Sequence, residues 1–265
     1  TRVIGTEAAD DIAGTDEHDE IWGGDGDDTI DANDGNDAVF GGDGDDHLSG
    51  GTGSDALHGE FGDDAAEGGD GDDMAFGYMG DDLLIGGDGA DWLVGGDGND
   101  TLHGDAGDDR IEGGFGGDLI RGGSGTDMVF GGNGDDVLIG TELAEDGSDT
   151  DAQDFLNGGK GDDTLIVGAN DFITGGDGED TIFVGGWNTD GAAHMDDFNG
   201  TEDQLVVVFD DSTDAEPEVG LEPASDESAG PTVLLDGVPI LTLQPGADVS
   251  LGDISLIGHS AVQAL

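Results

Sequence analysis

A single apolar residue recurs at every ninth position over most of the chain. Residues 23–49 read GGDGDDTID, ANDGNDAVF and GGDGDDHLS, and each unit has its apolar residue at position eight. The phase holds without slippage over fifteen units, residues 5–139. It resumes at residue 149, survives a one-residue deletion within residues 167–174 and ends at residue 183. About nineteen units follow this pattern, and each carries aspartate at position six.

Each unit combines a tight turn with a very short strand. Glycines at positions one, two and four permit positive φ and let the backbone fold closely around a ligand. Positions seven to nine alternate outward, inward and outward, so the strand is predicted to bury position eight alone. Two units make one coil, and the coils stack. The predicted fold is all-β: a parallel β-roll (β-solenoid) over residues 1–183, followed by a small β cap over residues 184–265.

The position-six aspartates of this fold are predicted to stack in two columns, one along each edge. One buried apolar side chain cannot offset the backbone entropy of nine residues, and stacked carboxylates oppose folding further. A cation between successive turns reverses the electrostatic repulsion. Carboxylate and carbonyl oxygens are the ligands that Ca²⁺ prefers, and the pattern lacks the nitrogen and sulfur ligands that zinc favours. The pattern therefore predicts bound Ca²⁺.

The charge balance indicates the same kind of partner. The chain has 66 Asp and Glu against 4 Lys and Arg residues, a formal net charge of −62, and 56 glycines among 265 residues. Composition alone favours disorder, but disordered acidic tails rarely repeat in register. Nucleic acid and anionic membrane surfaces would be repelled, whereas cations are attracted. The chain has no cysteine and no apolar run long enough to span a membrane, so disulfides and membrane insertion are not expected.

The repeat G-G-x-G-x-D-x-U-x, with so many units in phase, closely resembles the RTX (repeats-in-toxin) calcium-binding nonapeptide repeat. The resemblance covers residues 5–183. It implies that the position-six aspartates and the carbonyls of the glycine turn hold Ca²⁺, and that the chain folds on meeting calcium outside the cell. It also implies export by a type I secretion system, and the start, TRVIGTEAADD, has no signal-peptide pattern. The expected location is extracellular and includes the cell surface.

The candidate calcium ligands form two sets. The position-six set consists of Asp19, Asp28, Asp37, Asp46, Asp55, Asp64, Asp73, Asp82, Asp91, Asp100, Asp109, Asp118, Asp127, Asp136, Asp154, Asp163, Asp171 and Asp180. Position three is often Asp or Asn in such repeats, and that set consists of Asp25, Asp34, Asp43, Asp70, Asp88, Asp97, Asn133 and Asp177. If two stacked turns share one ion, the two columns hold roughly 17 Ca²⁺ ions.

Some units depart from the pattern. The first two, GTEAADDIA and GTDEHDEIW, lack glycine at position four, which predicts weak calcium binding or an N-terminal edge. Position three is Phe61, Met79, Ala106 or Phe115 in four other units, which are expected to have fewer oxygen ligands. Residues 140–148 add nine residues, which either form part of a further coil or loop out.

After the last repeat the period stops. HMDDFNGTEDQLVVVF, residues 194–209, resembles the segment that closes RTX rolls, and it is expected to cover the strand edges of the last coil. Residues 210–230 are acidic and contain proline, which predicts a loop. TVLLDGVPILTL, residues 232–243, predicts a hairpin around its Asp-Gly pair. Residues 253–257 predict another strand and resemble the tail of type I secretion targets.

No catalytic constellation accompanies the repeats. The sequence has neither H-E-x-x-H nor G-x-S-x-G, and its G-x-G turns lack the GK[ST] of a phosphate loop. Carboxylate pairs are abundant, but acid–base catalysis needs a pocket that separates their pKa values, which a thin roll does not offer. His47, His58 and His103 fall at outward positions and are expected to be solvated. The chain is therefore predicted not to be an enzyme.

Two functional hypotheses follow. In the first, the chain is an extracellular calcium-binding structural protein that folds after secretion and assembles into a matrix, surface layer or filament. In the alternative, it is the calcium-dependent folding and secretion module of a larger secreted toxin or enzyme. The first is preferred because roll and cap account for every residue of the sequence.

One outward column predicts a surface for self-association. Residues 18 apart stack on one sheet, and one such column consists of Trp22, Phe40, His58, Phe76, Val94, Glu112 and Phe130. The matching column on the opposite sheet runs from Asp31 to Ile139 and has no aromatic residue. A ladder of exposed apolar side chains forms a contiguous patch, and such patches mark interfaces. Its expected occupant is another copy of the chain, the chain's own C-terminal module, or an unidentified partner or substrate.

Overall fold

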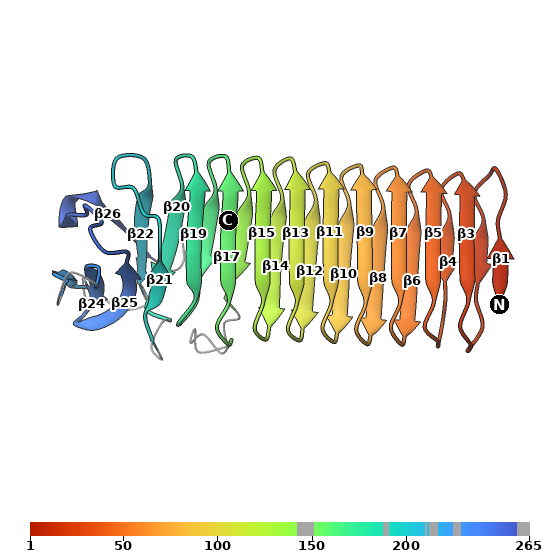
Figure 1. Ribbon diagram of the computed structural model, residues 1–265, viewed down its shortest axis with the longest axis horizontal. Coiled ribbons are helices and arrows are strands. Elements are labelled where there is room, and N and C mark those ends of the chain that lie inside the picture. The colour runs from red at the N-terminus through yellow and green to blue at the C-terminus, as the bar shows by residue number, and fades with distance from the viewer. Residues whose placement is uncertain (142–150, 188–190, 210, 212–216, 225–228, 259–265) are drawn as a thin grey trace.

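The computed structural model describes residues 1–141, 151–187, 191–209, 211, 217–224 and 229–258. The described chain forms two long sheets that lie face to face and run the length of the molecule (Figure 1). Sheet A has 14 strands and sheet B has 12. Successive strands of the repeats alternate between the sheets, so each coil contributes one strand to each. The predicted all-β parallel roll is confirmed.

Sheet A contains, in spatial order, β1 (Arg2–Ile4), β3 (Glu20–Asp25), β5 (Ala38–Asp43), β7 (Ala56–Phe61), β9 (Met74–Met79), β11 (Trp92–Asp97), β13 (Arg110–Phe115), β15 (Met128–Asn133), β17 (Phe155–Lys160), β19 (Phe172–Asp177), β21 (Ala193–Met195), β25 (Val238–Leu243), β24 (Thr232–Leu235) and β23 (Val219–Glu222). Sheet B contains β2 (Asp11–Ala13), β4 (Thr29–Asp31), β6 (His47–Thr52), β8 (Ala65–Asp70), β10 (Leu83–Asp88), β12 (Thr101–Ala106), β14 (Leu119–Ser124), β16 (Val137–Gly140), β18 (Thr164–Val167), β20 (Thr181–Gly185), β22 (Gln204–Phe209) and β26 (Ile254–Gly258). The described residues include one short 3₁₀ helix, η1 (Leu251–Asp253).

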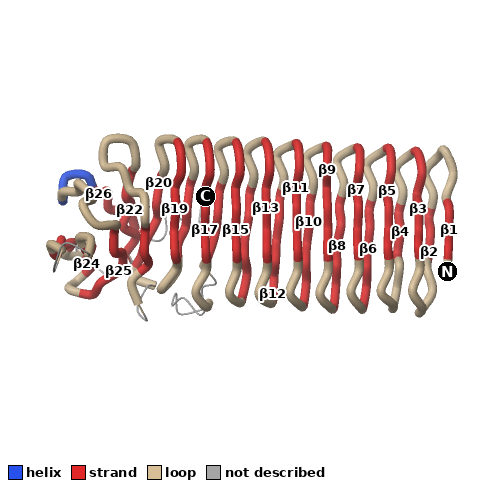
Figure 2. The backbone as a smooth tube through the Cα atoms, in the orientation of Figure 1, coloured by secondary structure: helices blue, strands red, loops and turns tan. Residues whose placement is uncertain are grey.

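The strands of the repeats are longer than the sequence predicts. Most span six residues, positions seven to nine of one unit and one to three of the next, as in β5. The predicted three-residue strand is therefore wrong. Gly41, the first residue of its unit, faces inward and is buried beside Val39 because side-chain direction alternates along the strand. A hydrophobicity pattern does not show this inward position, because glycine has no side chain. Figure 2 shows how short the connecting turns are.

The core consists of the apolar side chains that the two sheets bury between them. Position eight is completely buried in most units, as at Leu57, Leu93 and Ile120. Val39 of β5 pairs directly with Leu57 of β7, so identical repeat positions stack from coil to coil. The period of nine is thereby converted into a ladder with an 18-residue step.

The two irregularities of the period change this step without breaking the ladder. Met128 of β15 pairs with Phe155 of β17, a step of 27 residues, so the strands on either side of residues 140–148 are neighbours. No described strand lies between β15 and β17 in sheet A, and residues 142–150 lie outside the described residues. Phe155 in turn pairs with Phe172 across the one-residue deletion, a step of 17 residues.

The C-terminal residues extend both sheets. β22 and β26 continue sheet B in parallel, and β21 continues sheet A (Figure 1). The predicted hairpin is confirmed: β24 and β25 are antiparallel, and Asp236 and Gly237 both have positive φ, as a tight hairpin turn requires. β26 confirms the predicted last strand, but the loop predicted over 210–230 is wrong at β23. The boundary predicted at residue 183 falls inside β20, and the division into roll and cap stays a prediction.

The aromatic column on sheet A forms a stacked ladder. Ring centroids are 5.4 Å apart between Trp22 and Phe40, 4.7 Å between Phe40 and His58, and 5.1 Å between His58 and Phe76. Trp92 of the next coil meets Phe76 edge-on at 5.5 Å. We call this set, together with Tyr78, the aromatic ladder.

The observed environment of the His58 side chain differs from the predicted one. Its ring lies between Phe40 and Phe76, and its Nδ1 is 3.0 Å from the hydroxyl oxygen of Tyr78. Burial lowers the pKa of His58 below its ordinary value. The expectation that it is merely solvated is therefore wrong, because neighbouring coils bring aromatic rings to both of its faces.

Candidate metal centre

The position-six aspartates line the inner side of the turns in two columns. Column one consists of Asp19, Asp37, Asp55, Asp73, Asp91, Asp109, Asp127, Asp154 and Asp171. Column two includes Asp28, Asp46, Asp64, Asp82, Asp100, Asp118, Asp136, Asp163 and Asp180. All of these side chains are at most 3% exposed. Both predicted columns are present, and they are more deeply buried than a solvated edge would be.

One oxygen of each carboxylate other than Asp19 has a defined role, while Oδ1 of Asp19 lies 2.6 Å from the N-terminal ammonium. In column one, the backbone N–H of Asp37 donates to Oδ1 of Asp55 in the next coil at 2.7 Å. In column two, the N–H of Asp46 donates to Oδ1 of Asp64 at 2.8 Å. This bond repeats along both columns and joins each turn to the next. Oδ1 therefore completes the backbone hydrogen bonding of the stack.

The second oxygen, Oδ2, has no such role in the regular units. Sixteen position-six Oδ2 atoms are buried and have no hydrogen-bond partner among the described residues. They belong to Asp28, Asp37, Asp46, Asp55, Asp64, Asp73, Asp82, Asp91, Asp100, Asp109, Asp118, Asp127, Asp136, Asp154, Asp163 and Asp180. A buried carboxylate oxygen without a partner is strongly unfavourable, so a series of sixteen indicates cation ligands.

The first glycine of each unit makes room for this oxygen. A Cβ atom added to Gly41 would lie 2.2 Å from Oδ2 of Asp46, in the same unit. A Cβ atom added to Gly59 would lie equally close to Oδ2 of Asp64. Position one is therefore glycine because its Cα packs directly against the carboxylate of position six.

The fourth residue of each unit brings a carbonyl oxygen into the same turn. Gly53 has φ +130°, and a Cβ atom added there would lie 1.4 Å from the carbonyl oxygen of Gly35 in the preceding coil. The backbone hydrogen bonds of the turns use the carbonyl oxygens of positions three and six, as at Asp43 and Asp19. Among the described residues, none uses the carbonyl of a fourth-position glycine. Each regular turn thus has two oxygens that accept no hydrogen bond from the described residues: the carbonyl oxygen of position four and Oδ2 of position six.

The first two units satisfy both of these oxygens internally. The hydroxyl of Thr15 lies 2.9 Å from Oδ2 of Asp19 and 3.4 Å from the carbonyl oxygen of Glu17, which is at position four. The Thr15 N–H also donates to Oδ2 at 2.6 Å. Thr6 makes the same contacts to Asp10 in the first unit. A threonine hydroxyl therefore lies between the two acceptors that a cation would join in a regular turn.

The far ends of both columns are closed in a similar way. In the shortened unit, the N–H of Gly168 donates to Oδ2 of Asp171 at 2.6 Å. Beyond the last repeat, Asp203 accepts from Asp180 N–H at 3.3 Å through Oδ1 and from Asn199 N–H at 2.6 Å through Oδ2. Each column thus begins and ends with an internally bonded carboxylate. Asp19 and Asp171, two of the predicted ligands, differ from the other sixteen for this reason.

Burial without a partner shifts the titration of the regular aspartates. Burial raises the pKa of Asp64, Asp100, Asp109 and Asp163 to about 7. The neighbouring carboxylates of the same column raise it further, and the backbone N–H bond opposes the shift. These buried carboxylates therefore bind protons more readily than exposed aspartates do, whereas a bound divalent cation would favour their charged form.

The predicted position-three ligands lie elsewhere on the turn. Asp25, Asp34, Asp43, Asp70, Asp88, Asp97 and Asp177 are exposed, and Asn133 is half-buried. Within the described part of the chain, three carboxylate oxygens lie within 4.8 Å of one another in a single place, formed by Asp127, Asp151 and Asp154. In the regular turns the structure therefore brings together one buried carboxylate per unit with backbone oxygens, and it leaves position three at the surface.

Several contributing residues were not predicted. Asp203 continues column two, and its signal is the Asp-x-Leu spacing of residues 203–205, which repeats positions six and eight. Asp197 accepts from the N–H groups of Gly175 and Gly176 and so closes the last glycine turn. Thr6 and Thr15 have no counterpart in the regular units, so the repeat pattern does not identify their role.

Position five forms an outer ladder that also escaped the sequence analysis. The N–H of Asp63 donates to Oδ1 of Asp45 in the preceding coil at 2.9 Å, and the N–H of Asp81 donates to Oδ1 of Asp63 at 2.9 Å. These carboxylates are exposed, unlike those of position six. The doubled aspartate of the repeat therefore has an inner member with an unpaired oxygen and an outer member that caps the next turn.

The donor set fits Ca²⁺. It consists of carboxylate and carbonyl oxygens, which are the ligands of a hard cation that accepts six to eight oxygens in flexible geometry. Position-six Asp and the position-four carbonyl would hold the ion in each regular turn. Bound Ca²⁺ would supply the positive charge that buried carboxylates need, and it would link successive coils.

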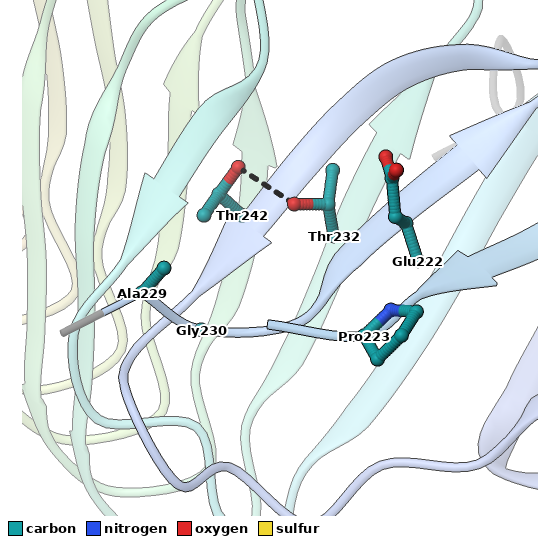
Figure 3. A pocket seen from close by; sticks show the side chains of 6 residues that line it. All are labelled: Glu222, Pro223, Ala229, Gly230, Thr232 and Thr242. Atoms are coloured by element: carbon teal, nitrogen blue, oxygen red, sulfur yellow. Dashed lines mark hydrogen bonds between the residues drawn. The ribbon is translucent and has the colours of Figure 1, made fainter. Parts of the chain in front are cut away.

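Hollows also lie on the described surface, away from the two columns. One, of about 370 Å³, lies in the C-terminal part and is lined by residues that include Glu222, Pro223 and Gly230 (Figure 3). Its two threonines, Thr232 and Thr242, bond to each other at 3.5 Å. This hollow contains no pair of titratable groups in contact. Among the described residues, no helix is long and apolar enough to cross a membrane.

Comparison with known families agrees with this chemistry. The family model of the RTX calcium-binding nonapeptide repeat (4 copies) matches residues 4–39, 40–75, 76–111, 103–138, 112–149, 139–169 and 167–186. These matches cover more than half of the chain and coincide with the coils that carry the two columns. A search of curated proteins found no match.

Proposed function

Because the chain belongs to the family of RTX calcium-binding nonapeptide-repeat proteins, we propose that it is an extracellular structural protein whose roll forms when Ca²⁺ binds after secretion. The observation that carries this proposal is the set of sixteen buried Oδ2 atoms without partners. Proteins of this family are typically secreted. Secretion before folding suits this chain, because its acidic columns repel one another until calcium is available.

The ion count follows from the closed ends of the columns. Column one has seven regular carboxylates between Asp19 and Asp171, and column two has nine between Asp10 and Asp203. With close to one ion for each regular carboxylate, the roll binds about fifteen or sixteen Ca²⁺ ions. Their charge offsets about half of the formal charge of −62, so the loaded protein stays acidic.

The loaded rolls associate with one another through the aromatic ladder. Trp92 and Tyr78 are 40% and 46% exposed, and Met74 beside them is 41% exposed. The described C-terminal strands of sheet A follow one another beyond β21, so none of them pairs with β3 to β11, which carry the ladder. A second copy is the preferred occupant because calcium loading relieves the repulsion between copies. The opposite column on sheet B, which contains Ile85 and His103 but no Phe, Tyr or Trp, is the natural comparison surface.

Sedimentation velocity in millimolar CaCl₂ tests this association. The variant F40S/F76S removes two rings of the ladder, and I85S/I139S alters the same repeat position on sheet B. Wild type and I85S/I139S are expected to form concentration-dependent oligomers, whereas F40S/F76S stays monomeric. A monomeric wild type at high concentration, or equal assembly of F40S/F76S, contradicts assembly through this face. Either outcome leaves calcium-dependent folding to be judged separately.

A further inference from the structure

The coil that bears the extra residues contains a carboxylate cluster that the regular coils lack. Asp127 directly precedes β15 and Asp154 directly precedes β17, and the two are successive members of column one. Asp151 comes three residues before Asp154 and brings a third carboxylate oxygen to within 4.8 Å of the other two. The described part of the chain has no second cluster of this kind.

Asp151 reaches this place by replacing a backbone acceptor. In a regular turn, the N–H of a fourth-position glycine donates to a carbonyl oxygen of the next coil, as from Gly107 to Ser124 at 2.8 Å. At the irregular coil, the N–H of Gly125 donates instead to Oδ1 of Asp151 at 2.9 Å. A carboxylate with a full negative charge therefore stands where other coils place a neutral carbonyl.

The other two carboxylates point unpaired oxygens into the same turn. Asp127 and Asp154 are both completely buried, and Oδ2 of each has no hydrogen-bond partner among the described residues. The cluster thus brings three carboxylates together around one turn, two of them with buried oxygens that have no hydrogen-bond partner among the described residues.

We propose that Asp127, Asp151 and Asp154 form a single Ca²⁺ site that binds its ion more tightly than the regular turns do. The site rests on the calcium binding of the repeats and adds a third carboxylate to it. Calcium affinity rises with the number of charged ligands and with the rigidity of the site. Here the Gly125 N–H holds Asp151, and the two column members are fixed between coils.

The position of the site gives it a structural consequence. The N–H of Asp127 donates to Oδ1 of Asp154 across 27 residues, at the point where the regular 18-residue step is interrupted. An ion held by both residues and by Asp151 links the two halves of the roll there. This ion is therefore the last to leave when calcium is withdrawn.

Native mass spectrometry of the full chain at graded free calcium tests the site. Asp151→Asn removes one charge and keeps an oxygen that can accept from Gly125. Asp97→Asn is the matched control, because Asp97 is the exposed position-three residue of a regular unit. Wild type and D97N are expected to keep one ion at a free calcium concentration at least about tenfold below that which empties the other sites. D151N is expected to lose this retained ion.

Anomalous diffraction from calcium-loaded wild-type crystals locates the ion independently of any variant. A calcium peak within about 2.3–2.6 Å of oxygens of Asp127, Asp151 and Asp154 is expected. The proposal is overturned if Asp151 lies outside that distance, or if D151N and D97N retain ions equally. A wild-type chain that binds no calcium at all would instead contradict the proposed function as a whole.

Discussion

The hydroxyl oxygen of Thr15 lies 2.9 Å from Oδ2 of Asp19 and 3.4 Å from the carbonyl oxygen of Glu17. In regular units the corresponding carboxylate and carbonyl oxygens have no donor among the described residues. The second unit therefore contains a protein group at the place where the regular units offer oxygens to a cation. This relationship explains how the roll can end without an ion.

Replacing Thr15 by valine should destabilise the calcium-loaded chain by about 1.5 kcal/mol, because a buried carboxylate oxygen loses its hydroxyl donor. Thr101→Val is the control, since Thr101 is half-buried at position seven of a regular unit. Guanidinium chloride unfolding in saturating calcium measures both variants. Equal free energies of unfolding for T15V and T101V would show that the hydroxyl does not substitute for an ion.

Replacing Gly41 by alanine should raise the calcium concentration needed for folding. The added Cβ would lie 2.2 Å from Oδ2 of Asp46, and relieving this contact costs about 1–3 kcal/mol. Gly252→Ala is the control, because its nearest neighbour, Oγ of Ser250, would lie at an ordinary 3.6 Å. Calcium titration followed by circular dichroism gives both midpoints. An unchanged midpoint for G41A would mean that this glycine does not shape the site.

Positions six and three should respond differently to the same chemical change. Asp46→Asn removes a charge from a buried oxygen without a partner, and it should weaken calcium-dependent folding by about 3 kcal/mol. Asp97→Asn alters an exposed side chain and should have a much smaller effect on folding. The calcium concentrations at which the two variants are half folded, measured by circular dichroism, test this difference. If D97N is as damaging as D46N, then position three contributes a ligand that the geometry of the turn does not indicate.

Acid should stabilise the calcium-free roll. The pKa of Asp64 and Asp100 is raised from 3.8 to about 7, so the folded columns bind more protons than the unfolded chain between these values. Stability is then greatest below pH 3.8 and is lost as the pH rises toward 7. The β signal of the calcium-stripped chain should therefore increase from pH 7.5 to pH 5. A constant or falling signal would contradict the raised pKa values.

With calcium present, the calcium concentration at which half of the chain is folded should instead rise in acid, because protons compete with calcium for the same carboxylate oxygens.

Much of the fold follows from two positions of the repeat. The apolar residue at position eight and the aspartate at position six recur in step, and both become buried columns in the roll. Strand length was missed at Gly41 because glycine carries no hydropathy signal on the inward face. The environment of His58 was missed because it depends on rings from two neighbouring coils.

The candidate site was predictable in its regular part and not at its irregular points. The repeat identifies Asp46 and its equivalents as ligands because carboxylate stacking follows directly from the period. The closing roles of Thr15 and Asp203, and the convergence of Asp151 on Asp127, depend on how departures from the pattern fold back onto a column. A period describes what repeats and does not describe how its interruptions are accommodated.

The central claim is that the sixteen unpaired oxygens require calcium for the roll to form. Far-ultraviolet circular dichroism of the full chain at pH 7.5, first in excess EDTA and then in millimolar CaCl₂, tests it most directly. We expect a largely unfolded spectrum in EDTA and a cooperative gain of β structure on adding calcium. A β spectrum that persists unchanged in excess chelator would contradict the account.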